Sequence, residues 1–111
     1  MQIELISKEE FDIILDIQKK HPILTFQNEG YQYVKKSKFT ENDQKAYDTV
    51  SKILSKHISG YSEFNNFRLS KKTNELQLRV QYNYGYDGEG THFIGVGYIL
   101  LDELLNGFRK E

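Results

Sequence analysis

The chain has 111 residues, of which 38% are hydrophobic and 28% charged, a balance typical of one soluble globular domain covering residues 1–111. It contains no cysteine, which excludes disulfides, thiolate catalysis, zinc–thiolate sites and iron–sulfur clusters. Fifteen basic residues oppose sixteen acidic ones, and this net charge of −1 disfavours nucleic acid as a partner, because domains that bind phosphates are usually clearly basic.

No apolar run approaches the roughly 18 residues that a membrane span needs, so we expect no membrane partner. The opening segment, MQIELISKEE, carries acids where a signal peptide has a basic region followed by an apolar one. These features predict a cytoplasmic protein.

The first elements are a short strand and a helix. Residues 1–6 alternate between apolar and polar side chains, which predicts a strand. The helix is expected over residues 8–20, because Ser7 and Glu10 have the spacing of a capping box and apolar residues recur on one face. Pro22 ends the helical pattern, since the residue before a proline is pushed out of the helical region.

A hairpin and a second helix follow. Residues 23–26 and 31–34 are rich in β-branched and aromatic side chains and flank a turn sequence, which predicts two paired strands. The second helix is expected over residues 41–58, with Thr40 as its N-cap and Gly60 in the left-handed conformation that often follows a helix.

The last third of the chain predicts a second hairpin, one more strand and a closing helix. In residues 76–84 apolar and polar side chains alternate without a break, which indicates an antiparallel strand with one buried and one wet face. Arg79 belongs to the wet face. Residues 93–99 read as the next strand, and the segment LLDELLNGF as a short helix that Asn106 and Gly107 can end.

Together these elements predict an α+β fold: a two-layer sandwich in which two main helices cover one face of an antiparallel sheet of five or six strands. No repeat, linker or low-complexity tract divides the chain.

The segment GYDGEG, residues 85–90, is the first candidate site. Glycine-rich loops bind phosphate when they open a helix, but here a strand follows and the loop carries Asp87 and Glu89 instead of a lysine. An EF-hand calcium loop would need further oxygen ligands that are missing. The segment is therefore expected to be a hairpin turn first and a contact surface for another protein second.

A catalytic or ligand-binding site built on Glu89 and His92 is the alternative, because loop ends at strand termini often carry function. One histidine with two carboxylates is a poor set of metal ligands, so neither a metal nor a cofactor is expected. His21 and His57 end helices, where the helix dipole favours an imidazolium for structural reasons alone. The sequence also lacks the motif of a serine or threonine nucleophile.

Eight tyrosines and seven phenylalanines exceed what a small core usually holds, and tyrosine is enriched at protein interfaces. The sequence thus predicts a protein-binding module, an inhibitor or immunity-type protein that occludes a partner enzyme such as a nuclease or toxin. The partner would be a protein, with a basic surface favoured. A small-ligand-binding protein or hydrolase-like enzyme and a nucleic-acid-binding accessory domain are the alternatives. The residues expected to bind the partner are Tyr84, Tyr86, Asp87, Glu89, His92 and Arg79.

Overall fold

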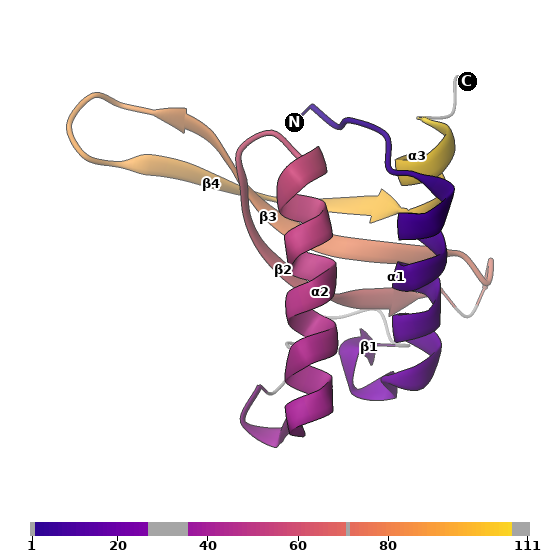
Figure 1. Ribbon diagram of the computed structural model, residues 1–111. Coiled ribbons are helices and arrows are strands. Elements are labelled where there is room, and N and C mark those ends of the chain that lie inside the picture. The colour runs from indigo at the N-terminus through magenta and orange to yellow at the C-terminus, as the bar shows by residue number, and fades with distance from the viewer. Residues whose placement is uncertain (1, 27–35, 71, 108–111) are drawn as a thin grey trace.

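A single mixed sheet carries the fold in the computed structural model, which describes residues 2–26, 36–70 and 72–107 (Figure 1). The strands lie side by side in the order β1 (Thr25–Phe26), β2 (Tyr61–Leu69), β3 (Leu76–Tyr86) and β4 (His92–Leu100). β1 runs parallel to β2, whereas β2 with β3 and β3 with β4 are antiparallel. The α+β class is as predicted, but the described residues form four strands in a mixed sheet instead of five or six antiparallel ones.

The N-terminal third explains this difference. Residues 1–6 were expected to form a strand, yet the described part contributes one isolated bridge, between Ile3 and Ile58. Pro22–Leu24 form a 3₁₀ turn, which suits the fixed φ and missing N–H of proline. The chain then enters β1, which pairs with β2. The predicted partner strand at 31–34 lies outside the described residues.

The helices follow the sequence signals closely. They are α1 (Lys8–Lys20), α2 (Glu41–His57) and α3 (Leu101–Asn106). Both predicted N-caps form complete capping boxes, Ser7 with Glu10 and Thr40 with Asp43, in which each side chain bonds to the other residue's main-chain N–H. α2 ends one residue before the expected position, and α3 ends at Asn106, with Gly107 as its C-cap at a φ of +90°.

α1 and α2 are tied to each other at both ends by a histidine and a carboxylate. Nδ1 of His21, the C-cap of α1, lies 2.7 Å from Oδ1 of Asp43 in the capping box of α2. Nε2 of His57, the last residue of α2, lies 3.1 Å from Oε2 of Glu10 in the capping box of α1. The C-terminus of each helix therefore meets the N-terminus of the other, which makes the two helices antiparallel. Both histidines lie at helix ends, as expected, whereas their pairing with carboxylates of the other helix was not predicted.

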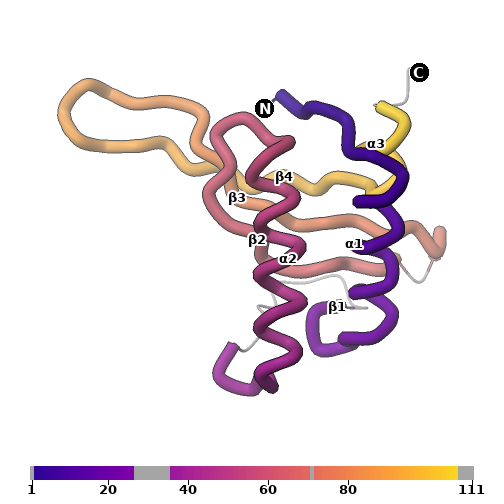
Figure 2. Tube along the Cα trace, in the orientation of Figure 1, coloured from indigo at the N-terminus to yellow at the C-terminus, as the bar shows by residue number. Residues whose placement is uncertain are grey.

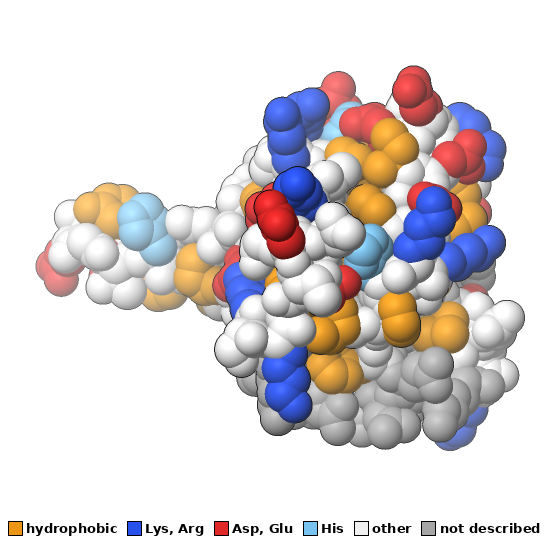
Figure 3. All heavy atoms as spheres, turned by 60° about the horizontal axis from the view of Figure 1, so that its bottom comes forward, with side chains coloured by type: hydrophobic (Ala, Val, Ile, Leu, Met, Phe, Trp, Pro, Cys, Tyr) orange, Lys and Arg blue, Asp and Glu red, His pale blue; other side chains and the backbone are white. Residues whose placement is uncertain are grey.

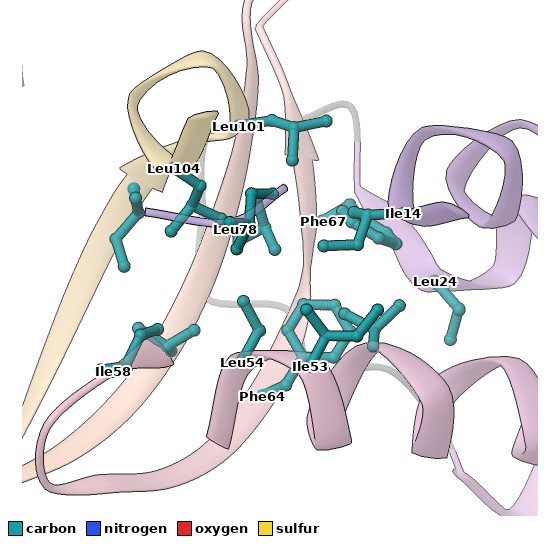
Figure 4. Packing of buried hydrophobic residues seen from close by; sticks show 14 of the residues in the cluster. Ile14, Leu24, Ile53, Leu54, Ile58, Phe64, Phe67, Leu78, Leu101 and Leu104 are labelled. Atoms are coloured by element: carbon teal, nitrogen blue, oxygen red, sulfur yellow. The ribbon is translucent and has the colours of Figure 1, made fainter. Parts of the chain in front are cut away.

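The helices cover one face of the sheet, and the core lies between the two layers (Figures 1 and 4). Every strand from β2 to β4 and every helix contributes side chains that are almost completely buried; among them are Ile14, Val50, Leu54, Phe64, Phe67, Leu78, Val80, Ile99 and Leu104. The buried face predicted for the alternating strand is confirmed at Leu78 and Val80, which are fully buried.

The opposite face of β3 is not the open wet surface that alternation suggested. Arg79 is only 5% exposed. β3 is an interior strand, so Arg79 lies between its cross-strand partners Asn66 on β2 and Tyr98 on β4. Asn66 is also buried, and the guanidinium of Arg68 stacks over the Tyr98 ring, 5.1 Å from its centroid. Arg79 is therefore buried, and its expected exposure is wrong.

Gly60, in the turn between α2 and β2, lies close to the backbone of β3. Its φ is +73°, the left-handed conformation that the sequence predicted. The N–H of Asn83 donates to the carbonyl oxygen of Gly60 at 2.7 Å. A Cβ atom at residue 60 would lie 2.4 Å from the carbonyl oxygen of Asn83, so only glycine fits there without movement of the backbone.

Candidate functional site

The β3–β4 hairpin extends well beyond the helical layer. β2 pairs with β3 only as far as Tyr82, and past that point β3 and β4 pair with each other alone. We refer to residues 83–94 as the arm. Figures 1 and 2 show that it projects away from the sheet and the helices, and Figure 3 shows hydrophobic side chains along it and an acidic one at its far end.

The tip of the arm is a turn organised by Asp87. Its Oδ1 accepts hydrogen bonds from the main-chain N–H groups of Glu89 and Thr91 at 2.7 and 3.1 Å, and its own N–H donates to the carbonyl of Thr91. The hydrogen bonds to the carboxylate hold the pKa of Asp87 below its usual range, and the bond from the Glu89 N–H has the largest effect. Gly88 and Gly90 supply the two positive φ angles. The turn predicted from GYDGEG is present, and Asp87 is its main internal support.

A bulge in the arm places aromatic rings outside the sheet. Asn83 pairs with Ile94 and Gly85 with Phe93, so Tyr84 has no partner on β4. Its ring stacks on that of Phe93, with centroids 5.8 Å apart, and it is 64% exposed. The carbonyl of the Asn83 side chain accepts from the N–H of Gly85 and so holds the bulge in place.

His92 belongs to a second small cluster near the tip. Nδ2 of Asn83 donates a hydrogen bond to Nδ1 of His92 at 2.7 Å. The centroid of the His92 ring lies 4.7 Å from that of the Tyr86 ring. The same amide group therefore supports both the bulge and the histidine. The Tyr86 side chain is 56% exposed. This cluster presents an aromatic surface whose rings are held by contacts within the arm.

Exposed apolar side chains are concentrated on this hairpin. Among the described residues, eight large hydrophobic side chains are exposed, and six of them come from residues 84–98: Tyr84, Tyr86, Phe93, Ile94, Val96 and Tyr98. Neither lysine nor arginine occurs between residues 83 and 100. Solitary exposed apolar residues are ordinary, but a concentration of six on one hairpin favours a contact surface.

The arm brings together five of the six residues expected to bind a partner, and it leaves out the sixth, Arg79, which is buried in the sheet. Sequence reasoning missed the exposed side chains Phe93, Ile94 and Val96. The signal that could have revealed them is the absence of any charged residue from His92–Leu100, whose apolar side chains point alternately to both faces.

The geometry gives little support to catalysis by Glu89 and His92. Within the described residues, no hydrogen bond or ion pair joins them, since His92 is engaged by Asn83 and Tyr86. The part of the chain that the structure describes contains no group of three His, Cys, Asp or Glu residues placed to hold a metal ion. Two cavities lie elsewhere: an open one of about 570 Å³ between residues 2–4 and 55–59, and an apolar one of about 190 Å³ beside Leu76 and Leu101.

No protein-family model matches the chain, and neither a curated protein nor a solved structure is significantly similar to it. Over residues 2–26, 36–70 and 72–107, no helix has the length and apolar character required to cross a bilayer.

Proposed function

We propose that this protein binds another protein through its arm, as an inhibitor or immunity-type protein that occludes the active site of a partner enzyme such as a nuclease or toxin. One observation carries the proposal: a projecting hairpin exposes tyrosine and phenylalanine rings around a turn that bears two acids. A narrow projection of this kind can enter a groove that a flat surface could not reach.

The charges suit a basic partner. Asp87 and Glu89 are exposed at the tip, and no basic residue of the arm offsets them. Because substrate grooves of nucleases are positively charged, the two acids would accelerate encounter, whereas the rings would supply most of the affinity. Tyr84 and Tyr86 fit that role, since interfacial tyrosines present a large apolar body at a low entropic cost.

In the experiment, the wild type and two matched variants are immobilised, and the proteins that each of them retains are compared. In the first, Asp87→Asn and Glu89→Gln remove two acids from the tip. In the control, Asp12→Asn and Asp16→Asn remove two acids from exposed i,i+4 ion pairs on α1, so that the net charge changes equally. Proteins retained by the wild type and the control but depleted on the tip variant are the candidates.

A candidate then has to pass two measurements. Its association rate with the wild type should fall with rising salt, and the tip variant should lose most of that dependence. Its enzymatic activity should be inhibited at stoichiometric amounts of this protein, and Tyr86→Ala should raise the dissociation rate. If no retained protein is depleted on the tip variant, or if the activity of every candidate is unaffected, the proposal is contradicted.

A further inference from the structure

β4 is an open edge of the sheet. It is the last strand in the order β1–β2–β3–β4, so one row of its main-chain groups has no strand beside it within the described part of the chain. Edge strands of natural proteins are usually short or protected by charges, prolines or bulges. β4 has nine residues with no acid, lysine, arginine or proline, and the irregularity in its pairing lies on β3, between Asn83 and Gly85.

The face of β4 that points away from the helices is apolar and exposed. Ile99 is buried in the core and pairs with Leu78, so the alternate positions Ile94, Val96 and Tyr98 lie on the opposite face. These three side chains are 50%, 43% and 48% exposed. They form a continuous row along an edge strand.

We propose that β4 pairs with β4 of a second copy of this chain, antiparallel about a two-fold axis at Val96. Two-fold dimers are the commonest closed assemblies of soluble proteins, and they need a surface that complements itself. In this pairing Val96 faces its own counterpart and Ile94 faces Tyr98 of the other copy. The apolar row then runs across the junction, and both sheets become one.

Charge is compatible with this partner. The strand contains no Asp, Glu, Lys or Arg, so none of these charges oppose each other along the junction. The acids of the arm, Asp87 and Glu89, lie beyond one end of β4. Antiparallel pairing places the two arms at opposite ends of the junction, where their charges stay apart.

The exposed apolar side chains of β4 supply a part of the area that a dimer requires. Ile94, Val96 and Tyr98 on one face of β4, and Phe93 on the other, are each about half exposed. With 150–250 Å² for a whole aromatic side chain and less for an aliphatic one, they offer roughly 300 Å² per copy. A standard interface takes about 800 Å² from each partner, of which roughly 450 Å² is apolar. The paired main chains and the flanking side chains supply the remainder.

The first test measures molar mass by sedimentation over a range of concentrations. The wild type should reach twice the 13.1 kDa of one chain. Val96→Lys places two like charges at the two-fold axis and should halve this mass, whereas Ile13→Lys is a matched control on α1, where the wild-type side chain is 39% exposed. A circular dichroism melt verifies that both variants fold. A wild type that stays at the mass of one chain overturns the proposal. In that case a different protein would be the partner of β4.

The second test uses the absence of native cysteine. Residues directly opposite each other in antiparallel strands have Cα atoms about 4.5–5.5 Å apart, within the range of a disulfide. Val96→Cys should therefore form a covalent dimer on mild oxidation, and Ile13→Cys should not. A dimer that both lysine variants retain, or that Val96→Cys fails to cross-link, overturns the two-fold pairing. The arm variants of the proposed function should leave the mass unchanged, so each proposal can fail without the other.

Discussion

Replacement of Gly60 by alanine isolates the cost of one backbone contact, because Gly88 provides a matched control. Both residues are left-handed, with φ of +73° and +82°. An added Cβ at Gly60 meets the carbonyl oxygen of Asn83 at 2.4 Å, whereas at Gly88 nothing lies within 4 Å. The two substitutions therefore share the same conformational penalty and differ in the collision.

The magnitudes follow from these contacts. A left-handed alanine costs about 1 kcal/mol relative to glycine, which is the whole loss expected for Gly88→Ala. At Gly60 the obstacle is the backbone of Asn83, so the turn between α2 and β2 must move away from β3. This separation also weakens the hydrogen bond from the N–H of Asn83, worth about 1 kcal/mol, and strains the neighbouring chain. Gly60→Ala should thus reduce the free energy of unfolding by about 3 kcal/mol.

The assay is urea denaturation at 25 °C, followed by far-ultraviolet circular dichroism for the wild type and both variants. The midpoint should shift markedly for Gly60→Ala and slightly for Gly88→Ala, with the same slope m, because a local collision leaves the surface exposed on unfolding unchanged. Equal losses in the two variants, within about 0.5 kcal/mol, would refute the reasoning.

Three further predictions concern the core, the helix ends and metals. Leu78→Ala should cost about 2–5 kcal/mol in the same assay, because the side chain is fully buried; a loss near zero would contradict the described core. The pKa of Glu10 lies below its ordinary 4.5, mainly because of the hydrogen bond from the Ser7 backbone, and that of Asp43 lies below its ordinary 3.8, mainly because of the hydrogen bond with His21. Both carboxyls therefore stabilise the fold above their unfolded pKa values. The thermal midpoint should therefore fall as the pH drops below about 4.5 through the lowered pKa values, and less steeply in Asp43→Asn. A strong chelator should leave the midpoint unchanged, whereas a drop of several degrees would indicate a bound metal.

The parts of the fold that the sequence predicted well are those determined by neighbours in the chain. Both main helices have their capping signals and their apolar face within one segment, so their positions could be predicted to within a residue. The pairing of β1 was out of reach, because Thr25 meets Phe67 and this contact depends on how distant segments pack. Proline at residue 22 marked an end to the helix but not the turn that follows.

In the candidate site, too, the local features could be predicted from the sequence and the non-local ones could not. The turn at Asp87 is local, and its glycines and acids could be interpreted directly. The burial of Arg79 could not be foreseen, since alternation tells which residues share a face but not whether that face is covered. The projection of the arm beyond Tyr82 depends on the lengths of β2 and β3 relative to each other, which no pattern within either strand records.

The reciprocal ties between α1 and α2 have a consequence for hydrogen exchange and for redesign. Glu10 closes the capping box of α1 and also holds His57, 47 residues away at the end of α2. An event that frays the first turn of α1 therefore releases the last turn of α2, and the pair formed by His21 and Asp43 couples the other two ends in the same way. Amide protons at partnered ends should exchange at correlated rates, and neither helix can be transplanted or recapped as an independent unit.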